Sequence, residues 1–203
     1  MTVAMGSLLI GLGLGVVVVR RRSVAIALVT TQALVLAAIA LRQAGTASDT
    51  VAGLALVMRA VALGALFFVA VARSRERQPL RARVTPMVRA GLAVVLILIF
   101  TALVPAFGLP SRHAEPVELA LVAAGLTCAV TRRSTLFQVL GIVLVENGLA
   151  LAGIEAPHAS SVIIELGVTL DLTLVVGVAA LFHLRIFSEF GAGDSAALRS
   201  LRD

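Results

Sequence analysis

The sequence predicts an all-α membrane protein with about seven transmembrane helices, and three observations lead to this fold class. Of the 203 residues, 60% are hydrophobic and 14% are charged, whereas soluble domains are about 45–50% apolar and about 25% charged. Apolar runs recur at the length of about 20 residues that crosses a bilayer core of about 30 Å. The arginines lie between these runs, mostly on alternate sides.

Seven apolar runs are the predicted spans. The first ends at an arginine cluster, whereas a cleaved signal peptide would carry its positive charge first, so we expect a retained helix. The fifth run is short unless it extends back through Glu118. Most prolines lie in the predicted loops, and none lies in the middle of a span. The predicted spans are residues 3–19, 24–41, 51–72, 87–107, 117–130, 135–154 and 162–187.

The distribution of arginine predicts the orientation of the chain. Fourteen arginines follow the odd-numbered spans, two follow the even-numbered spans, and Arg59 lies inside the third span. Because cytoplasmic loops carry the excess of basic residues, we expect an external N-terminus and a cytoplasmic C-terminus. The longest predicted cytoplasmic loop, residues 73–86, divides the chain into a three-helix part, residues 1–86, and a four-helix part, residues 87–203.

Several functional classes are excluded by residue counts. The single cysteine, Cys128, excludes intrachain disulfides, Cys-rich zinc sites and iron–sulfur ligation. All basic residues except histidine are arginine, so a retinal Schiff base on lysine is impossible. The arginines punctuate apolar runs rather than gather on a soluble face, so we expect a bilayer and no nucleic acid as partner. No nucleophile and base or metal-ligand set is evident, so we expect no cofactor, no metal and no catalysis by this chain alone.

Ionisable residues inside the spans are the candidate functional groups, because each costs about 2.5–3.5 kcal/mol at the centre of a bilayer on insertion scales. They are Arg59, Glu146, Glu165 and Asp171. The helical rise places Glu146 about 16 Å from the cytoplasmic end of its span and Asp171 about 14 Å from the outer end of the next. Arg59 falls about 12 Å from the outer side. Three groups of opposite sign therefore converge near the midplane.

This convergence suits either a proton or ion relay or a buried structural ion pair. Arg59 is either a counter-ion that keeps one acid charged or a strut to a backbone carbonyl of another helix. Glu165 lies near the end of its span, where an interfacial role is equally compatible with the sequence. His183, at the cytoplasmic end of the last span, is either a proton entry group or an interfacial anchor.

A glycine-rich string occurs in the first span at Gly11, Gly13 and Gly15. It has no preceding strand, so nucleotide binding is disfavoured. The four-residue spacing of Gly11 and Gly15 instead predicts a helix-packing face.

The last two predicted spans resemble a known membrane subunit, hydrogenase-4 component E of the formate hydrogenlyase and energy-converting hydrogenase group. The resemblance is carried by TRRSTLFQVLGIVLVENGLALAG (131–153), IELGVTLDLTLVVGVAALFHLRIF (164–187) and DSAALRSLRD (194–203). It is most specific at VENG, residues 145–148, and at the ELGVTLD of residues 165–171. The C-terminal part is also similar to the NuoK-type subunit of respiratory complex I. Gln32 resembles a glutamine of the family's second helix, and Arg59 falls where the family often has lysine.

The resemblance implies a cofactor-free subunit in the membrane arm of an electron-transport complex of the prokaryotic cell membrane. Antiporter-like membrane subunits and soluble nickel–iron or iron–sulfur hydrogenase subunits would be its partners, and the arm would couple redox chemistry to proton or sodium movement. Glu146 and Asp171 match the acids of the family's paired helices, and Glu165 is a further family-like acid. Because arginine effectively cannot lose its proton, Arg59 in place of lysine favours a fixed counter-charge over a deprotonating relay.

Two other functional hypotheses fit the same residues. The chain could serve a multi-subunit cation/proton antiporter, which shares the NuoK-like module but lacks metal-cluster subunits. It could also be an assembly scaffold whose buried charges form structural ion pairs. In the scaffold case, neutral substitution of those charges would cause the complex to lose neighbouring subunits, and it would not uncouple ion transport.

Overall fold

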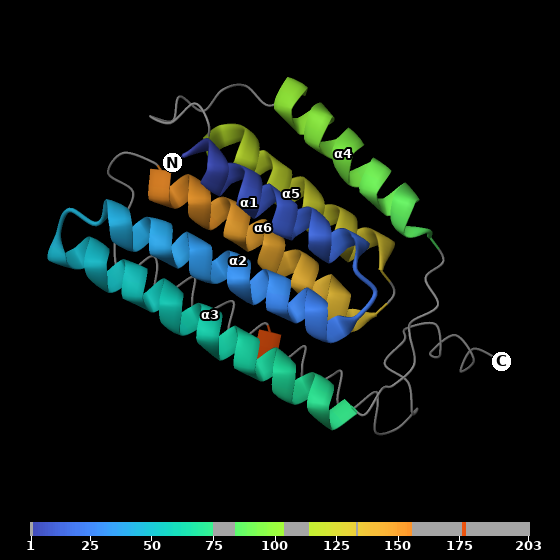
Figure 1. Ribbon diagram of the computed structural model, residues 1–203, viewed down its shortest axis with the longest axis horizontal. Coiled ribbons are helices and arrows are strands. Elements are labelled where there is room, and N and C mark those ends of the chain that lie inside the picture. Colours follow the sequence, from blue (N-terminus) through green and yellow to red (C-terminus); the bar gives the residue numbers. More distant parts are fainter. Residues whose placement is uncertain (1, 75–83, 104–113, 133, 156–175, 178–203) are drawn as a thin grey trace.

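The computed structural model describes residues 2–74, 84–103, 114–132, 134–155 and 176–177. In these ranges the chain folds into six helices that overlap the first six predicted spans, which confirms the all-α class (Figure 1). The predicted seventh span, residues 162–187, lies outside the described residues except for 176–177. The helices are α1 (Val3–Val18), α2 (Arg22–Gln43), α3 (Ala47–Ser74), α4 (Pro86–Leu103), α5 (Ala114–Thr131) and α6 (Thr135–Glu155).

Four of these helices are long and apolar enough to cross a membrane. They are Arg22–Gln43, Ala47–Ala72, Pro86–Leu103 and Thr135–Glu155, whereas α1 is a shorter apolar helix of 16 residues. Because several such helices lie in one chain, the protein is a multi-pass membrane protein.

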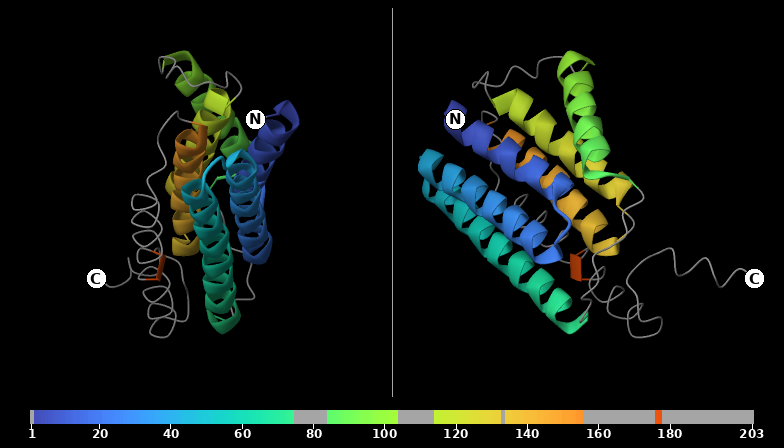
Figure 2. Two further views of the ribbon diagram at one scale, coloured as in Figure 1. Left: turned by 90° about the vertical axis from the view of Figure 1, so that its left-hand side faces the viewer. Right: turned by 45° about the vertical axis from the view of Figure 1, so that its right-hand side comes forward.

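Helices α1, α2, α5 and α6 form the centre of the bundle (Figure 1). Here α1 packs on α2 and α5, and α6 packs on α2 and α5, so helices from both predicted parts of the chain share one core. Helix α3 covers α2 on one side, and α4 lies on the other side against α5 and α1. Figure 2 shows α4 inclined to the helices beside it. The centre of the bundle therefore presents neighbouring faces of α1, α2 and α6 to one another.

Helices α5 and α6 approach each other closely at two facing glycines. A Cβ atom added to Gly125 would lie 2.5 Å from the carbonyl oxygen of Gly141, and one added to Gly141 would lie 2.6 Å from the carbonyl oxygen of Gly125. About two turns further along α6, a Cβ on Gly148 would lie 3.0 Å from the carbonyl oxygen of Glu118. Glycine thus lets the two backbones touch, which is how small residues bring membrane helices together.

The expected packing of α1 through Gly11 and Gly15 is confirmed at Gly15, where an added Cβ would lie 3.1 Å from the Leu28 side chain of α2, but it is wrong at Gly11. No heavy atom lies within 4 Å of a Cβ built on Gly11, whereas one on Gly13 would lie 3.3 Å from Leu121 and 3.4 Å from the side-chain nitrogen of Gln32. The buried positions of α1 explain the difference, because they follow a three-to-four residue stripe that includes position 13 and excludes position 11. These buried residues are Gly6, Leu9, Gly13, Val16 and Val17.

Local capping fixes where α3 and α4 begin. The Asp49 carboxylate accepts hydrogen bonds from the backbone N–H groups of Gly45 (3.2 Å) and Thr46 (3.0 Å), while the Asp49 N–H donates to the Thr46 hydroxyl (3.2 Å). This reciprocal arrangement satisfies amides that would otherwise lack partners at the helix start. Before α4, the Thr85 hydroxyl accepts a hydrogen bond from the Val88 N–H at 3.4 Å, and Pro86 takes the first helical position that suits its missing N–H.

Candidate functional site

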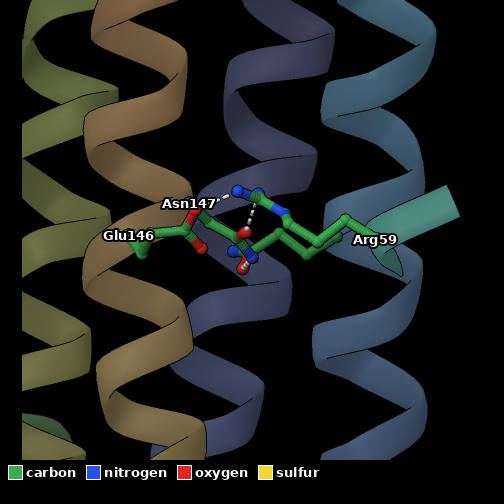
Figure 3. A network of polar contacts seen from close by, with 4 residues as sticks. Arg59, Glu146 and Asn147 are labelled. Carbon is green, nitrogen blue, oxygen red and sulfur yellow. Dashed lines mark hydrogen bonds and ion pairs between the residues drawn. The ribbon is translucent and has the colours of Figure 1, made fainter. Parts of the chain in front are cut away.

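The candidate site is a buried ion pair between α3 and α6. The Arg59 guanidinium donates a hydrogen bond to the Glu146 carboxylate, and the two side chains are 3% and 14% exposed (Figure 3). The structure therefore joins two of the ionisable residues that sequence analysis placed at neighbouring depths. A buried carboxylate is stabilised in its charged form by a guanidinium this close.

Two neutral amides connect Arg59 to the other central helices. A second guanidinium nitrogen of Arg59 donates to the side-chain oxygen of Asn147 at 3.4 Å. The Asn147 nitrogen donates to the Gln32 oxygen at 3.1 Å, and the Gln32 nitrogen donates to the backbone carbonyl of Leu9 at 3.0 Å. We call the side chains of Glu146, Arg59, Asn147 and Gln32, together with the Leu9 carbonyl, the polar chain. It links α3, α6, α2 and α1 across the core.

The short sequence VENG of α6 serves three neighbouring helices at once. Consecutive residues of an α-helix point about 100° apart, as its 3.6 residues per turn require. Glu146 thus meets α3, Asn147 meets α2 as well as Arg59, and Gly148 lets the backbone of α5 approach near Glu118. The charge of Glu146 meets the guanidinium on α3, the amide of Asn147 meets the amide on α2, and the missing side chain of Gly148 leaves room for α5.

The side-chain amides of Gln32 and Asn147 are fully buried, and each both donates and accepts a hydrogen bond. Gln32 both accepts from Asn147 and donates to Leu9, and its nitrogen lies against the glycine at position 13 of α1, where a larger side chain would crowd it. Buried amides without partners are expensive, so these contacts fix the side-chain positions. Because amides do not titrate at ordinary pH, they hold Arg59 in place rather than exchange protons.

The other predicted site residues are not placed by this structure. Glu165, Asp171 and His183 lie outside the described residues, so the predicted convergence of Asp171 with Glu146 stays a prediction. Among the described residues, no group of three or more His, Cys, Asp or Glu side chains lies together as a metal site would require. Of the four ionisable residues predicted inside the spans, Arg59 and Glu146 are the two that the structure brings together.

Sequence reasoning did not assign roles to several polar residues of the core. Asn147 and Gln32 are both polar residues in the middle of apolar runs, but the sequence alone gives neither of them a hydrogen-bond partner. Glu118 was considered only as an extension of the fifth span, but it is buried on α5, and one of its carboxylate oxygens has no hydrogen-bond partner among the described residues. The missed signal was an amide or acid at an inward-facing helix position.

Replacing Asn147 with leucine is expected to lower the free energy of unfolding by about 2–4 kcal/mol, since it leaves the Gln32 oxygen without its donor and one nitrogen of Arg59 without its acceptor. Thermal unfolding of the purified chain in mild detergent, followed by circular dichroism, measures the change. Leu149→Ala, at a 62% exposed position of the same helix, is the control and should stay within about 0.5 kcal/mol. Equal behaviour of the two variants would contradict a stabilising role for the polar chain.

Comparison with known proteins finds similarity to two kinds of bacterial protein. The chain is 30% identical over 153 residues to the uncharacterized protein Rv0085 of Mycobacterium tuberculosis, which covers 73% of this chain and 70% of that protein. It is 31% identical over 132 residues to hydrogenase-4 component E of Escherichia coli strain K12, and equally to that of Shigella flexneri. This match covers 61% of the chain and spans 59% of the length of component E. No protein-family model and no solved structure matches the chain.

Proposed function

We propose that this chain, which belongs to the same family as the uncharacterized protein Rv0085 of Mycobacterium tuberculosis, is a membrane subunit of a multi-subunit hydrogenase-type complex. Its proposed task is to contribute buried charge to proton translocation or coupling in the membrane arm. The observation that carries this proposal is the Arg59–Glu146 ion pair held inside a bundle of apolar helices. Similarity to hydrogenase-4 component E supports the type of complex.

Glu146 is the proposed proton acceptor, and Arg59 is the proposed fixed charge. A carboxylate changes its charge when it binds a proton, whereas arginine keeps its charge throughout. Ionisable residues inside membrane spans face bundle interiors and mark proton or ion pathways, as well as structural pairs. In this division of roles, proton occupancy of Glu146 depends on how close the Arg59 guanidinium lies.

The coupling step is proposed to be a small displacement of Arg59. When the guanidinium moves away, the buried carboxylate favours its neutral form and takes up a proton, and when it returns, the proton leaves. The polar chain supports this step because it connects Arg59 through Asn147 and Gln32 to α1 and α2. Motion of those helices, driven by neighbouring subunits, would therefore reach the ion pair. Asp171, Glu165 and His183 are the proposed remaining groups of the pathway.

The test of this proposal is Glu146→Gln in the assembled complex. The glutamine keeps the size of the side chain but cannot bind a proton, so coupled proton transport per assembled complex is expected to fall about 10²-fold, the scale of a lost proton-transfer group. Proton uptake into proteoliposomes that contain the complex measures the rate. Glu115→Gln, in the first turn of α5, is the matched control and should leave the rate unchanged.

Two results would contradict the proposal. A Glu146→Gln complex that assembles fully and transports protons at the parent rate would exclude Glu146 as the acceptor. A complex that transports normally but assembles in reduced amount would assign the ion pair a structural role. Quantification of assembled complex by native gel electrophoresis, alongside the transport rate, separates these two results.

A further inference from the structure

Arginines gather at one end of the bundle, where α1 and α5 end and where α2, α4 and α6 begin. Three of them are buried: Arg22, at the start of α2, is 8% exposed; Arg89, in the first turn of α4, is 0% exposed; and Arg132, directly after α5, is 6% exposed. Arg20, after α1, lies close enough to act electrostatically on Arg89 and Arg132. The arginine distribution predicts this end to be cytoplasmic. We call Arg20, Arg89 and Arg132 the arginine cluster.

Arg132 is fixed in place by its neighbours. Its guanidinium donates to the backbone carbonyls of Val17, at 3.0 Å, and Val19, and it lies over the Phe137 ring with 4.0 Å between the guanidinium carbon and the ring centroid. Burial, together with the charges of Arg89 and Arg20, lowers the pKa of Arg132 to about 10. These neighbours hold the guanidinium, but none of them carries a negative charge to neutralise it.

Arg89 has no hydrogen-bond acceptor in the part of the chain that the structure describes. All three of its guanidinium nitrogens are buried and without a partner there. Among the described residues, the ionisable groups that act on it are the Cys128 thiol and Arg20, and neither is a carboxylate. A fully buried guanidinium without a counter-charge is strongly unfavourable, so the position calls for an anion.

Two further features at this end favour an anion. The N-termini of α2, α4 and α6 lie here, and each adds partial positive charge from its free backbone amides. Ser134, which immediately precedes α6, has a buried hydroxyl that has no hydrogen-bond partner among the described residues. Positive charge and the unpartnered donors of Arg89 and Ser134 therefore accumulate at one place in the part of the chain that the structure describes.

The side chains beside Arg89 indicate that the anion belongs to a lipid. Met87 and Val88 are 86% and 60% exposed, and Leu92, one turn beyond Arg89, is also exposed. Helix α4 is one of the candidate membrane spans, and its buried residues are Arg89 and Ala93. An acyl chain along the apolar face of α4 would thus reach a phosphate at Arg89, at the depth where headgroups lie.

We propose that the arginine cluster binds the phosphate of an anionic phospholipid, with Arg89 as the principal ligand and the exposed face of α4 against its acyl chains. Arg132 and Arg20 would contribute charge, and the bound lipid would stabilise the attachment of α4 to α1 and α5. Basic pockets between membrane helices on the cytoplasmic side are suited to such headgroups. This site is independent of proton binding at Glu146.

The test is Arg89→Met, because its effect on stability should reverse with the lipid. The full chain is reconstituted in nanodiscs of phosphatidylcholine alone or with phosphatidylglycerol, and thermal unfolding is measured. In phosphatidylcholine, removal of an uncompensated buried charge should raise the melting temperature by about 2–4 °C. With phosphatidylglycerol, the parent should gain stability and Arg89→Met should not. Native mass spectrometry should show phosphatidylglycerol retained about tenfold less by the variant.

The control is Arg42→Met, which removes an exposed arginine near the other end of the bundle. It should keep the full gain from phosphatidylglycerol. Persistence of that gain in Arg89→Met would overturn the proposal, as would a lower melting temperature of this variant in phosphatidylcholine. Inorganic phosphate added to phosphatidylcholine nanodiscs distinguishes the source of the anion. A gain equal to that from phosphatidylglycerol would overturn the lipid assignment in favour of a free-anion site.

Discussion

Arg59→Met is expected to lower the free energy of unfolding by about 3–5 kcal/mol, because it withdraws the guanidinium from a carboxylate that stays buried. Methionine has a similar length and packs well in apolar surroundings, so the effect should come from charge rather than from a cavity. Chemical unfolding of the purified chain in mild detergent measures it. Arg42→Met, at an exposed arginine on α2, is the matched control and should change stability by about 0.5 kcal/mol or less.

The double variant Arg59→Met with Glu146→Met separates the cost of an orphaned charge from the value of the pair. Replacing both partners of a buried ion pair with apolar side chains is often neutral or stabilising, so the double variant should recover most of the lost stability. Recovery to within about 1 kcal/mol of the parent would show strong coupling between the two residues. A double variant whose loss of stability equals the sum of the losses in Arg59→Met and Glu146→Met would contradict the ion pair.

Gly141→Ala is expected to cost about 3 kcal/mol, because the added methyl group would lie 2.6 Å from the backbone carbonyl of Gly125 and 2.7 Å from the backbone nitrogen of Ala129. Backbone atoms cannot rotate away as a flexible side chain can, so α5 and α6 must separate. Thermal unfolding in detergent measures the loss. Gly125→Ala should act similarly, and the double variant should cost less than the sum, since the helices separate once for both.

The matched control for this prediction is Gly153→Ala on the same helix. A Cβ atom there meets no heavy atom within 4 Å. Alanine also favours a helix over glycine by about 1 kcal/mol, so this variant should be neutral or slightly more stable. If Gly141→Ala and Gly153→Ala behaved alike, the close backbone approach of α5 and α6 would be contradicted.

Hydropathy predicted the helices well because burial in a bilayer requires long apolar runs with every backbone group paired internally. The six described helices each overlap a predicted span. Packing faces were less predictable, since a membrane helix is apolar all around and its inward face carries little compositional signal. This is why the spacing of Gly11 and Gly15 predicted a close contact correctly at Gly15 but not at Gly11, and why the buried stripe through Gly13 was not predicted.

The sequence predicts the depth of the site residues in the membrane, but it does not predict which side chains contact each other. Counting residues from the span ends placed Arg59 and Glu146 near one level, but only the rotation of α3 and α6 decides whether they meet, and rotation depends on packing. Asn147 and Gln32 drew less attention because a neutral amide costs much less in an apolar core than a charge does. Their roles are evident in the structure, where α2 lies between α3 and α6 and the two amides connect Arg59 to α2.

Arg89 shows why the sequence alone does not predict the arginine cluster. In the sequence it is one of six arginines around the third predicted loop, where basic residues ordinarily set orientation and remain in water. In the structure the start of α4 lies against the end of α5, and this residue is buried beside Arg132. A basic residue that sets topology and one that binds an anion look the same until the helices are assembled.

Gentle detergent extraction of the native membrane, affinity capture of this chain, and mass spectrometry with metal analysis of the bound proteins test the central claim most directly. A membrane subunit of a hydrogenase-type complex should bring nickel or iron–sulfur subunits together with antiporter-like membrane subunits. Antiporter-like subunits without metal would contradict the hydrogenase-type assignment and favour a cation/proton antiporter. A lone, stable protein with no copurifying subunits would contradict both.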